Sequence, residues 1–426
     1  MNFPSITWWA WAVAALVVVA LTWLAARAWG PRNEPFEEYS AGDADTDADS
    51  NAGMPDGDED AEGSDDGADD GVVNYGDDLP EPEEPTPTPT PGGKGYAHTN
   101  AGMRPRKLQL MGRTHYYQLP KGAAIGTLVI FPGCARAATG FWPYAPGTCP
   151  ECTGFPEDVS QTKQALARGY AVLVLTPQDT KTLCWSSKRD LKDALEIVEH
   201  FLAANALMSK PLYTLGASSG GGLALALGGY AQYAKSRVRV SGIVQEVATT
   251  QSPRVDTHTG KFPPVVWVVM ERFPDERRAA NVHVALLKRH GVPAAVVGSP
   301  IRRITPNYFS DRIPAITPAQ SRQIGVALKR IGQIDADGNL LSDPKKSGWD
   351  LKLRKLLPMM SPTSKTLSLV FRKSAVWQAM TLAYSKHEHT GDYTGAALAW
   401  FEGGGKQDFA QLVERYRVRT PAALTI

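Results

Sequence analysis

One stretch, residues 211–222, constrains the fold of this chain more than any other. It reads Pro-Leu-Tyr-Thr-Leu-Gly-Ala-Ser-Ser-Gly-Gly-Gly, an apolar segment that runs directly into a glycine-rich turn. Gly216 and Gly220 each stand two positions from Ser218, the spacing of a sharp, strained turn between a strand and a helix. Residues 223–234 are apolar and rich in small residues, which predicts a helix packed closely on a sheet.

Strand and helix patterns alternate through the chain from residue 96 to residue 300. We expect strands at 107–111, 115–119, 127–131, 171–175, 211–215, 240–247, 265–270 and 294–297, and helices at 157–168, 190–204, 223–234 and 277–290. This alternation is typical of an α/β fold, a mainly parallel, doubly wound sheet with helices on both faces. Residues 301–380 interrupt it and are predicted to be an insertion, helical around 321–331, before a last loop and helix at 387–401.

A serine hydroxyl becomes a good nucleophile only when a base removes its proton, and a carboxylate usually orients that base. In doubly wound hydrolases these residues follow the order serine, acid, histidine. After Ser218, the segment Ser-Lys-His-Glu-His-Thr390 supplies two loop histidines, His387 and His389. We select His387 as the base, because it precedes the last predicted helix.

The acid is expected a few residues beyond a late strand. The strand at 265–270 is followed by Glu-Arg-Phe-Pro-Asp275. Asp275 is the first choice for the acid and Glu271 the second, since both are placed to reach the histidine loop. The alternative role of Asp275 is to cap the helix that follows.

Oxyanion donors are predicted where the strand at 127–131 ends. The segment Phe131-Pro-Gly-Cys134 brings the backbone N–H of Cys134 towards that of Ser219, and two such donors stabilise a developing oxyanion. The alternative is an ordinary Pro-Gly turn. The constellation predicts a serine hydrolase that acts through an acyl-enzyme on a small-molecule or lipid-like carboxylic ester, with no metal or organic cofactor.

The four cysteines, Cys134, Cys149, Cys152 and Cys184, lie within one stretch of the chain. A CxxC half-site for zinc or redox chemistry competes with two disulfides formed in an oxidising compartment. Because a second ligand pair with metal spacing is missing, we interpret them as structural cysteines, which favours a luminal or extracellular location.

The first 95 residues differ from the rest of the chain. Residues 6–26 are apolar, with tryptophans towards both ends, which predicts a membrane anchor within residues 1–33. A signal sequence cleaved near Ala28, giving a secreted protein, is the alternative. Residues 34–95 are acidic and then rich in Pro and Thr, and are predicted to be a disordered linker before a catalytic domain at 96–426.

Charge is divided unevenly along the chain. Of 45 Lys and Arg residues and 44 Asp and Glu residues, residues 1–93 hold two of the former and 21 of the latter, which leaves a basic body. The basic residues are scattered and no nucleic-acid motif accompanies them, so we interpret the charge as a solvated surface and expect no nucleic-acid partner.

Several motifs together resemble a family of largely uncharacterised plant and algal proteins of the α/β-hydrolase superfamily, over residues 105–402. The motifs are Gly133-Cys134, Phe141-Trp142, Cys149-Pro-Glu-Cys152, Gly154-Phe-Pro-Glu157, Cys184-Trp185, Gly216-Ala-Ser-Ser-Gly-Gly221, Phe309-Ser-Asp-Arg-Ile-Pro314 and Leu382-Ala-Tyr-Ser-Lys-His-Glu388. The resemblance implies an α/β-hydrolase fold with Ser218, Asp275 and His387 as its triad. It does not supply a substrate.

Two further hypotheses follow from the same residues. The fold can serve as a binding module with an idle triad, which a Ser218–His387 separation far beyond hydrogen-bond reach would favour. It can also be an acyltransferase, because an alcohol resolves the same acyl-enzyme.

Overall fold

The computed structural model describes residues 99–426, apart from residue 235 and residues 249–252, 254–260, 362–363, 365–366 and 371–372. The predicted membrane segment and the acidic linker both lie outside this range. Within the described range, no helix combines the length and apolar character needed to cross a membrane.

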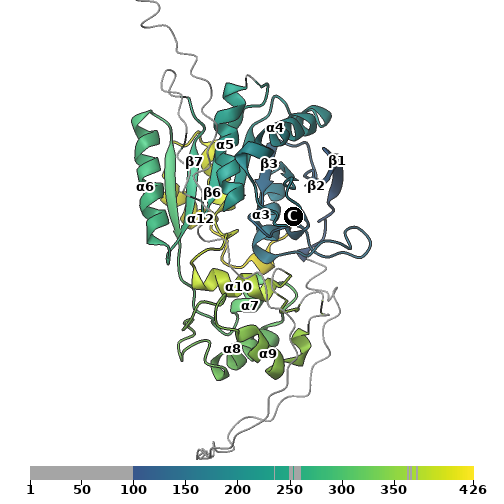
Figure 1. Ribbon diagram of the computed structural model, residues 1–426, viewed down its shortest axis with the longest axis vertical. Helices are drawn as coiled ribbons and strands as arrows, with labels where there is room; N and C mark the ends of the chain where they lie inside the picture. The colour runs from purple at the N-terminus through teal and green to yellow at the C-terminus, as the bar shows by residue number, and fades with distance from the viewer. Residues whose placement is uncertain are drawn as a thin grey trace, which may run out of the picture. The chain divides into compact units, whose positions relative to one another are not determined.

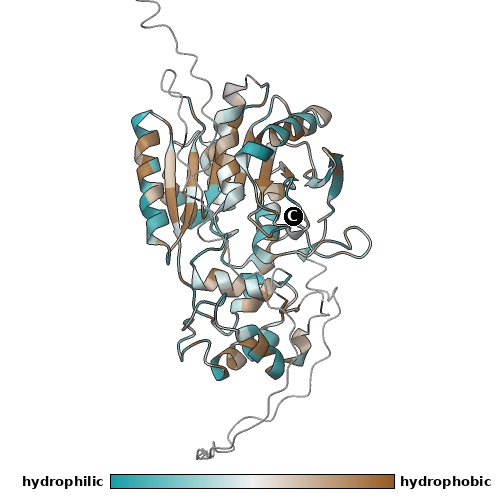
Figure 2. Ribbon diagram, viewed as in Figure 1, coloured by the Kyte–Doolittle hydropathy of each residue, from teal (hydrophilic) through white to brown (hydrophobic). Residues whose placement is uncertain are grey.

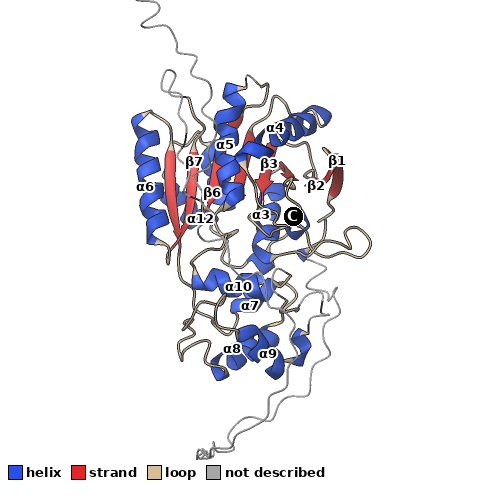
Figure 3. Cartoon of the chain, in the orientation of Figure 1, coloured by secondary structure: helices blue, strands red, loops and turns tan. Residues whose placement is uncertain are grey.

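An eight-stranded sheet forms the centre of the described chain, with strand order β1-β2-β4-β3-β5-β6-β7-β8 (Figures 1 and 3). The strands are β1 (Arg106–Leu110), β2 (Arg113–Gln118), β3 (Gly126–Phe131), β4 (Tyr170–Val174), β5 (Leu212–Ala217), β6 (Val240–Glu246), β7 (Val265–Met270) and β8 (Ala294–Ser299). The strands from β4 to β8 along this order pair in parallel, while β2 pairs antiparallel with both β1 and β4. The predicted opening hairpin and mainly parallel sheet are confirmed.

The central strands are apolar along their whole length, as expected for strands covered on both faces. Every residue of β3, β4, β5 and β7 is buried, and the strands at the centre of the sheet are largely brown, the hydrophobic end of the scale, in Figure 2. Parallel strands place their carboxyl ends at one edge of a sheet, so the segments that follow β3, β5, β7 and β8 meet there.

Helices cover the sheet and continue beyond it. They are α3 (Pro156–Ala167), α4 (Ser187–Ala204), α5 (Ser219–Tyr233), α6 (Pro274–Arg289), α7 (Tyr308–Arg312), α8 (Pro318–Arg330), α9 (Trp349–Leu356), α10 (Ala375–Tyr384), α11 (Thr394–Glu402) and α12 (Phe409–Tyr416), with short 3₁₀ turns at Ala138–Phe141, Pro358–Met360 and Pro421–Ala423. Helix α5 packs on β5 and β6, α6 on β7 and β8, α3 on β4, and α11 on β6.

The segment between β8 and the last helices contains α7, α8, α9 and α10, which gather below the sheet in the view of Figure 1. It has an apolar cluster of its own, in which the rings of Trp349 and Trp377 lie 5.0 Å apart. The expected helix around 321–331 is α8. The sequence patterns did not indicate α7, α9, α10 or α12.

Candidate active site

Ser218 occupies the turn between β5 and α5 and has a φ of 49°, a left-handed conformation that is costly for a residue with a side chain. The turn is possible because its neighbours are glycines. A Cβ on Gly216 would collide with the backbone of Gly220, and a Cβ on Gly220 would collide with the carbonyl of Phe131. The Ser218 N–H donates to the carbonyl of Glu246 at 2.9 Å, which anchors the turn to β6.

His387 lies beside this serine. Its Nε2 is 3.3 Å from Ser218 Oγ, and the side chain is exposed. Two residues earlier, Ser385 ends α10 and holds the loop to the sheet: its hydroxyl donates to the Ser299 carbonyl at 2.6 Å and accepts the Glu271 N–H at 3.0 Å. The ends of β7 and β8 thus support the loop that carries the histidine.

The carboxylates proposed as the acid have other contacts. Asp275 lies in the first turn of α6, is exposed and forms an ion pair with Arg278. It is not the cap of that helix, because the N-cap residue is Phe273. The Glu271 carboxylate accepts the Ile301 N–H at 2.8 Å. Asp275 and Glu271 as the acid therefore stay predictions, although the backbone of Glu271 does contact the histidine loop.

The predicted oxyanion loop packs against the serine turn. Trp185 contributes two hydrogen bonds: its indole N–H donates to the Pro132 carbonyl at 2.8 Å, and its backbone N–H donates to Ser219 Oγ at 3.2 Å. Ser219 Oγ also lies 3.2 Å from Cys134 Sγ. The Ser219 N–H belongs to the first turn of α5, where backbone donors lack partners inside the helix. In the described part of the chain, no hydrogen bond engages the Cys134 N–H.

Two disulfides account for the four cysteines. Cys134 is joined to Cys184, and Cys149 to Cys152. The interpretation as structural cysteines is thereby confirmed. The first disulfide ties the oxyanion loop to the segment before α4; the second closes a short buried turn.

A chain of charges, buried except for the half-buried Arg136, joins the oxyanion loop to the histidine loop. Arg136, two residues after Cys134, donates to Glu388 at 2.8 Å. Glu388 Oε1 lies 3.0 Å from His389 Nδ1, and His389 Nε2 lies 3.0 Å from Asp158 Oδ2 on α3. We call Arg136, Glu388, His389 and Asp158 the latch. It fixes the residue next to His387 relative to the loop of the proposed oxyanion donors.

Burial and charge decide the protonation of the latch. Burial alone would lower the pKa of His389, but Asp158 and Glu388 raise it well above its ordinary value. Burial likewise opposes ionisation of Glu388, but Arg136 and His389 hold its pKa well below its ordinary value. His389 is therefore an imidazolium that donates from both ring nitrogens to two carboxylates.

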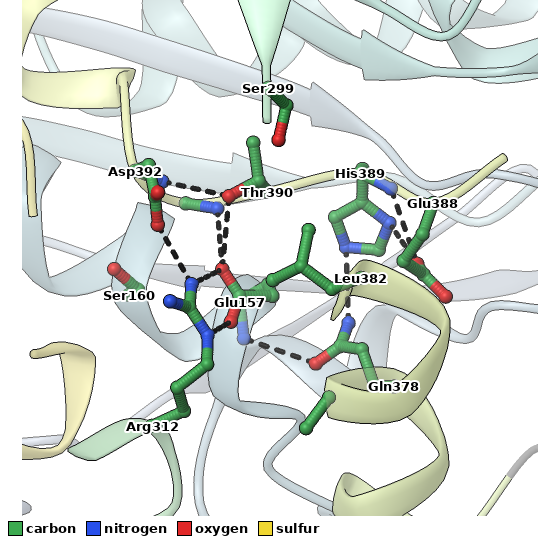
Figure 4. Close-up of polar contacts among 12 residues, drawn as sticks. Glu157, Ser160, Ser299, Arg312, Gln378, Leu382, Glu388, His389, Thr390 and Asp392 are labelled. Carbon is green, nitrogen blue, oxygen red and sulfur yellow. Dashed lines mark hydrogen bonds and ion pairs between the residues drawn. The ribbon is translucent and has the colours of Figure 1, made fainter. Parts of the chain in front are cut away.

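A second buried set of contacts fixes the residues after His389 (Figure 4). Glu157 on α3 accepts from the Thr390 hydroxyl at 3.2 Å and from the Gly391 N–H at 2.9 Å. It also binds Arg312 of α7 through both oxygens, at 2.8 and 2.7 Å. Glu246 accepts the Thr390 N–H at 3.0 Å, and burial raises the pKa of Glu246 to about 8. The inserted helices are thereby tied to the histidine loop.

Comparisons with known proteins identify esterases among the similar structures, all at low similarity. A carboxyl esterase from Tuber melanosporum has 14% identity and a TM-score of 0.34, covering 46% of this chain and 76% of its own. A hyperthermophilic esterase from Pyrobaculum calidifontis has 15% identity and a TM-score of 0.36, covering 56% and 88%. A thermostable esterase from Pseudomonas putida has 12% identity and a TM-score of 0.31, covering 46% and 72%. No family model matches the chain, and no curated protein matches its sequence.

The sequence reasoning missed the latch, although part of its signal was present. Glu388 and His389 were visible beside His387, but their partners on α3 and in the oxyanion loop are far away in sequence. Asp158 resembles an ordinary first-turn acid of a helix, and Arg136 an ordinary loop arginine. Only the fold shows that these charges are buried together.

Proposed function

We propose that this chain is a serine hydrolase of the α/β-hydrolase superfamily that cleaves small-molecule or lipid-like carboxylic esters through an acyl-enzyme. The observation that supports this best is the 3.3 Å approach of His387 Nε2 to Ser218 Oγ at a strained turn between a strand and a helix. The same distance argues against a binding module with an idle triad, in which the serine and the histidine would lie far beyond hydrogen-bond distance of each other.

In the proposed reaction, His387 removes the Ser218 proton as Oγ attacks the ester carbonyl. The backbone N–H groups of Cys134 and Ser219 bind the oxyanion. His387 then protonates the departing alcohol, which leaves an acyl group on Ser218. Water, deprotonated by His387, attacks that acyl group, and the carboxylic acid leaves as Ser218 regains its proton.

A fluorophosphonate probe tests the nucleophile, because such probes form a covalent bond only with an activated serine. We expect the wild type to be labelled and Ser218→Ala to be unlabelled. Ser219→Ala is the matched control: it keeps both the Ser218 hydroxyl and the backbone N–H of residue 219, and should still be labelled. Labelling that persists in Ser218→Ala excludes the proposal.

The acid is tested separately with Asp275→Asn and Glu271→Gln. Loss of a triad carboxylate lowers kcat by about 10⁴-fold. The residue that orients His387 should show a loss of that size, while the other variant should stay near wild type. Two variants with wild-type kcat would remove both residues as candidates.

A further inference from the structure

A small, strongly charged pocket lies where the residues after β8 meet Asp392 and the segment after α12. Its volume is about 190 Å³, and five arginines and two aspartates contribute to its lining. The arginines are Arg302, Arg303, Arg312, Arg417 and Arg419, and the aspartates are Asp311 and Asp392. None of the residues proposed for ester hydrolysis lines this pocket, so the inference does not depend on the proposed function.

Asp392 neutralises the inner part of the pocket. Its Oδ1 accepts from Arg312 at 2.7 Å and its Oδ2 accepts from Arg302 at 2.9 Å. Burial opposes ionisation of Asp392, but Arg312 and Arg302 hold its pKa well below its ordinary value. With Glu157 bound to the other side of Arg312, these two guanidinium groups are compensated within the protein.

The outer arginines are compensated poorly. Arg417 reaches Asp392 Oδ2 only at 3.4 Å, and its Nε–H is buried with no hydrogen-bond partner among the described residues. Arg303 is exposed, and within the described chain its side chain forms no hydrogen bond or ion pair. Arg419 has one exposed contact, 3.3 Å to Glu414. Three guanidinium groups thus border a pocket whose inner carboxylate is already occupied.

A buried N–H donor without an acceptor is unfavourable, and a cluster of arginines repels itself unless an anion is present. Guanidinium groups bind the oxygens of phosphate and carboxylate in pairs, with planar geometry. Against one lining carboxylate, Asp311, the three outer arginines leave about two positive charges, which favours a doubly charged oxyanion over a singly charged carboxylate. A tetrahedral phosphate dianion supplies this charge together with at least three acceptor oxygens, and the protonated oxygen of inorganic hydrogen phosphate can also donate to Asp311.

The size of the pocket agrees with a small ligand. Pockets for drug-sized molecules measure about 300–1,000 Å³, and one water takes about 30 Å³ of liquid volume. The 190 Å³ here suits one oxyanion with a small substituent. We propose that this pocket binds a small tetrahedral dianion, either inorganic phosphate or a phosphate monoester.

Phosphorus-31 NMR titration of the full chain tests this binding directly, with inorganic phosphate and glycerol 3-phosphate as probes at constant ionic strength. We expect saturable binding of one phosphate per chain, with sulfate as a competitor and acetate ineffective. The tighter of the two phosphate probes shows whether the pocket takes the free ion or its ester. The proposal is overturned if phosphate does not bind saturably in a chloride buffer of the same ionic strength. It is also overturned if acetate displaces phosphate as well as sulfate does.

Variants at the exposed arginines locate the site without disturbing the buried charges. Arg303→Ala and Arg419→Ala should each weaken phosphate binding about tenfold or more, because each removes a charge-assisted contact. Arg330→Ala is the matched control, an exposed arginine of α8 that does not line the pocket, and should bind as the wild type does. Phosphate binding that is unchanged in the Arg303→Ala and Arg419→Ala double variant places the anion elsewhere and refutes the assignment.

Discussion

The disulfide between Cys134 and Cys184 is expected to matter for both stability and activity, whereas the one between Cys149 and Cys152 should matter less for either. The two pairs differ in the length of chain they close, with sequence separations of 50 and 3. In the chain-entropy relation, a crosslink over the longer loop stabilises the fold by about 4 kcal/mol and one over the shorter loop by about 2 kcal/mol.

The two bridges also differ in position. Cys134 carries a proposed oxyanion donor, and its sulfur contacts Ser219 in the serine turn. Loss of one oxyanion donor typically lowers kcat by about 100-fold to 1,000-fold. Release of this loop should therefore lower kcat by up to about 100-fold. KM should change little, because the oxyanion donors act mainly in the transition state. Release of the buried Cys149 turn should leave kcat unchanged.

Two double variants separate these effects. Cys149→Ala/Cys152→Ala keeps only the first bridge, and Cys134→Ala/Cys184→Ala keeps only the second. Urea unfolding of each variant with and without reductant isolates its remaining bridge, since the cavity left by the alanines is the same in both conditions. Hydrolysis of a chromogenic acetate ester gives kcat in parallel. Equal losses of stability on reduction, or a kcat that reduction of the first bridge does not change, would refute the reasoning.

Three further predictions concern the latch, the buried Glu246 and the serine turn. Arg136→Met and Glu388→Gln should each destabilise the protein by about 1.5–3 kcal/mol, since each removes a charge-assisted contact while Glu388 or His389 keeps its other partners. The double variant should cost less than the sum of the two, with a coupling of about 1–3 kcal/mol in urea unfolding, and additive losses would contradict a direct pair. Burial raises the pKa of Glu246 to about 8, so the folded state binds this proton more tightly than the unfolded state does. The free energy of unfolding should therefore fall as the pH rises from about 4.5 to 8, by up to about 1.4 kcal/mol per pH unit. Glu246→Gln should flatten this slope in urea unfolding at pH 5, 7 and 9, and equal slopes in the two proteins would exclude Glu246 as its source. Gly220→Ala should unfold the protein or abolish labelling by the fluorophosphonate probe, because the added methyl group would meet the carbonyl of Phe131 in β3. The control Gly325→Ala lies at an open position of α8 and should stabilise the protein by about 0.5–1 kcal/mol in thermal melting.

The sheet and the serine turn were predictable because their signals are local. A fully buried strand such as β3 is a short apolar run, and Gly216 and Gly220 mark a turn that larger residues cannot form. The position of His387 beside Ser218 agrees with a prediction that rested on chain order and on its place in a loop before the last predicted helix. Each of these signals lies within one segment or in the order of the segments along the chain. Such signals can be read without knowing how distant segments pack against one another.

The insertion was predicted less well, for a physical reason. Its helices α7 and α9 have only five and eight residues, too few for a clear helical period. Arg312 of α7 resembles a surface arginine in the sequence, yet it is almost fully buried between Glu157 and Asp392. Because a buried ion pair is made by partners far apart in the chain, no local pattern distinguishes it from solvated charge.

The use of charge to hold the histidine loop follows from what the loop contains. Residues 387–392 read His-Glu-His-Thr-Gly-Asp, without one large apolar side chain. Apolar packing cannot fix such a segment, because there is little apolar surface to bury. Hydrogen bonds and ion pairs can, and they are directional, so Glu388, His389 and Thr390 each have a defined partner on a neighbouring element. Buried ion pairs add little net stability compared with apolar packing, but breaking one is costly, so other positions of the loop are disfavoured. For the proposed role of His387 as the base, a network that fixes position matters more than one that only adds stability, since a displacement of about 1 Å at a catalytic group can cost about 100-fold in rate.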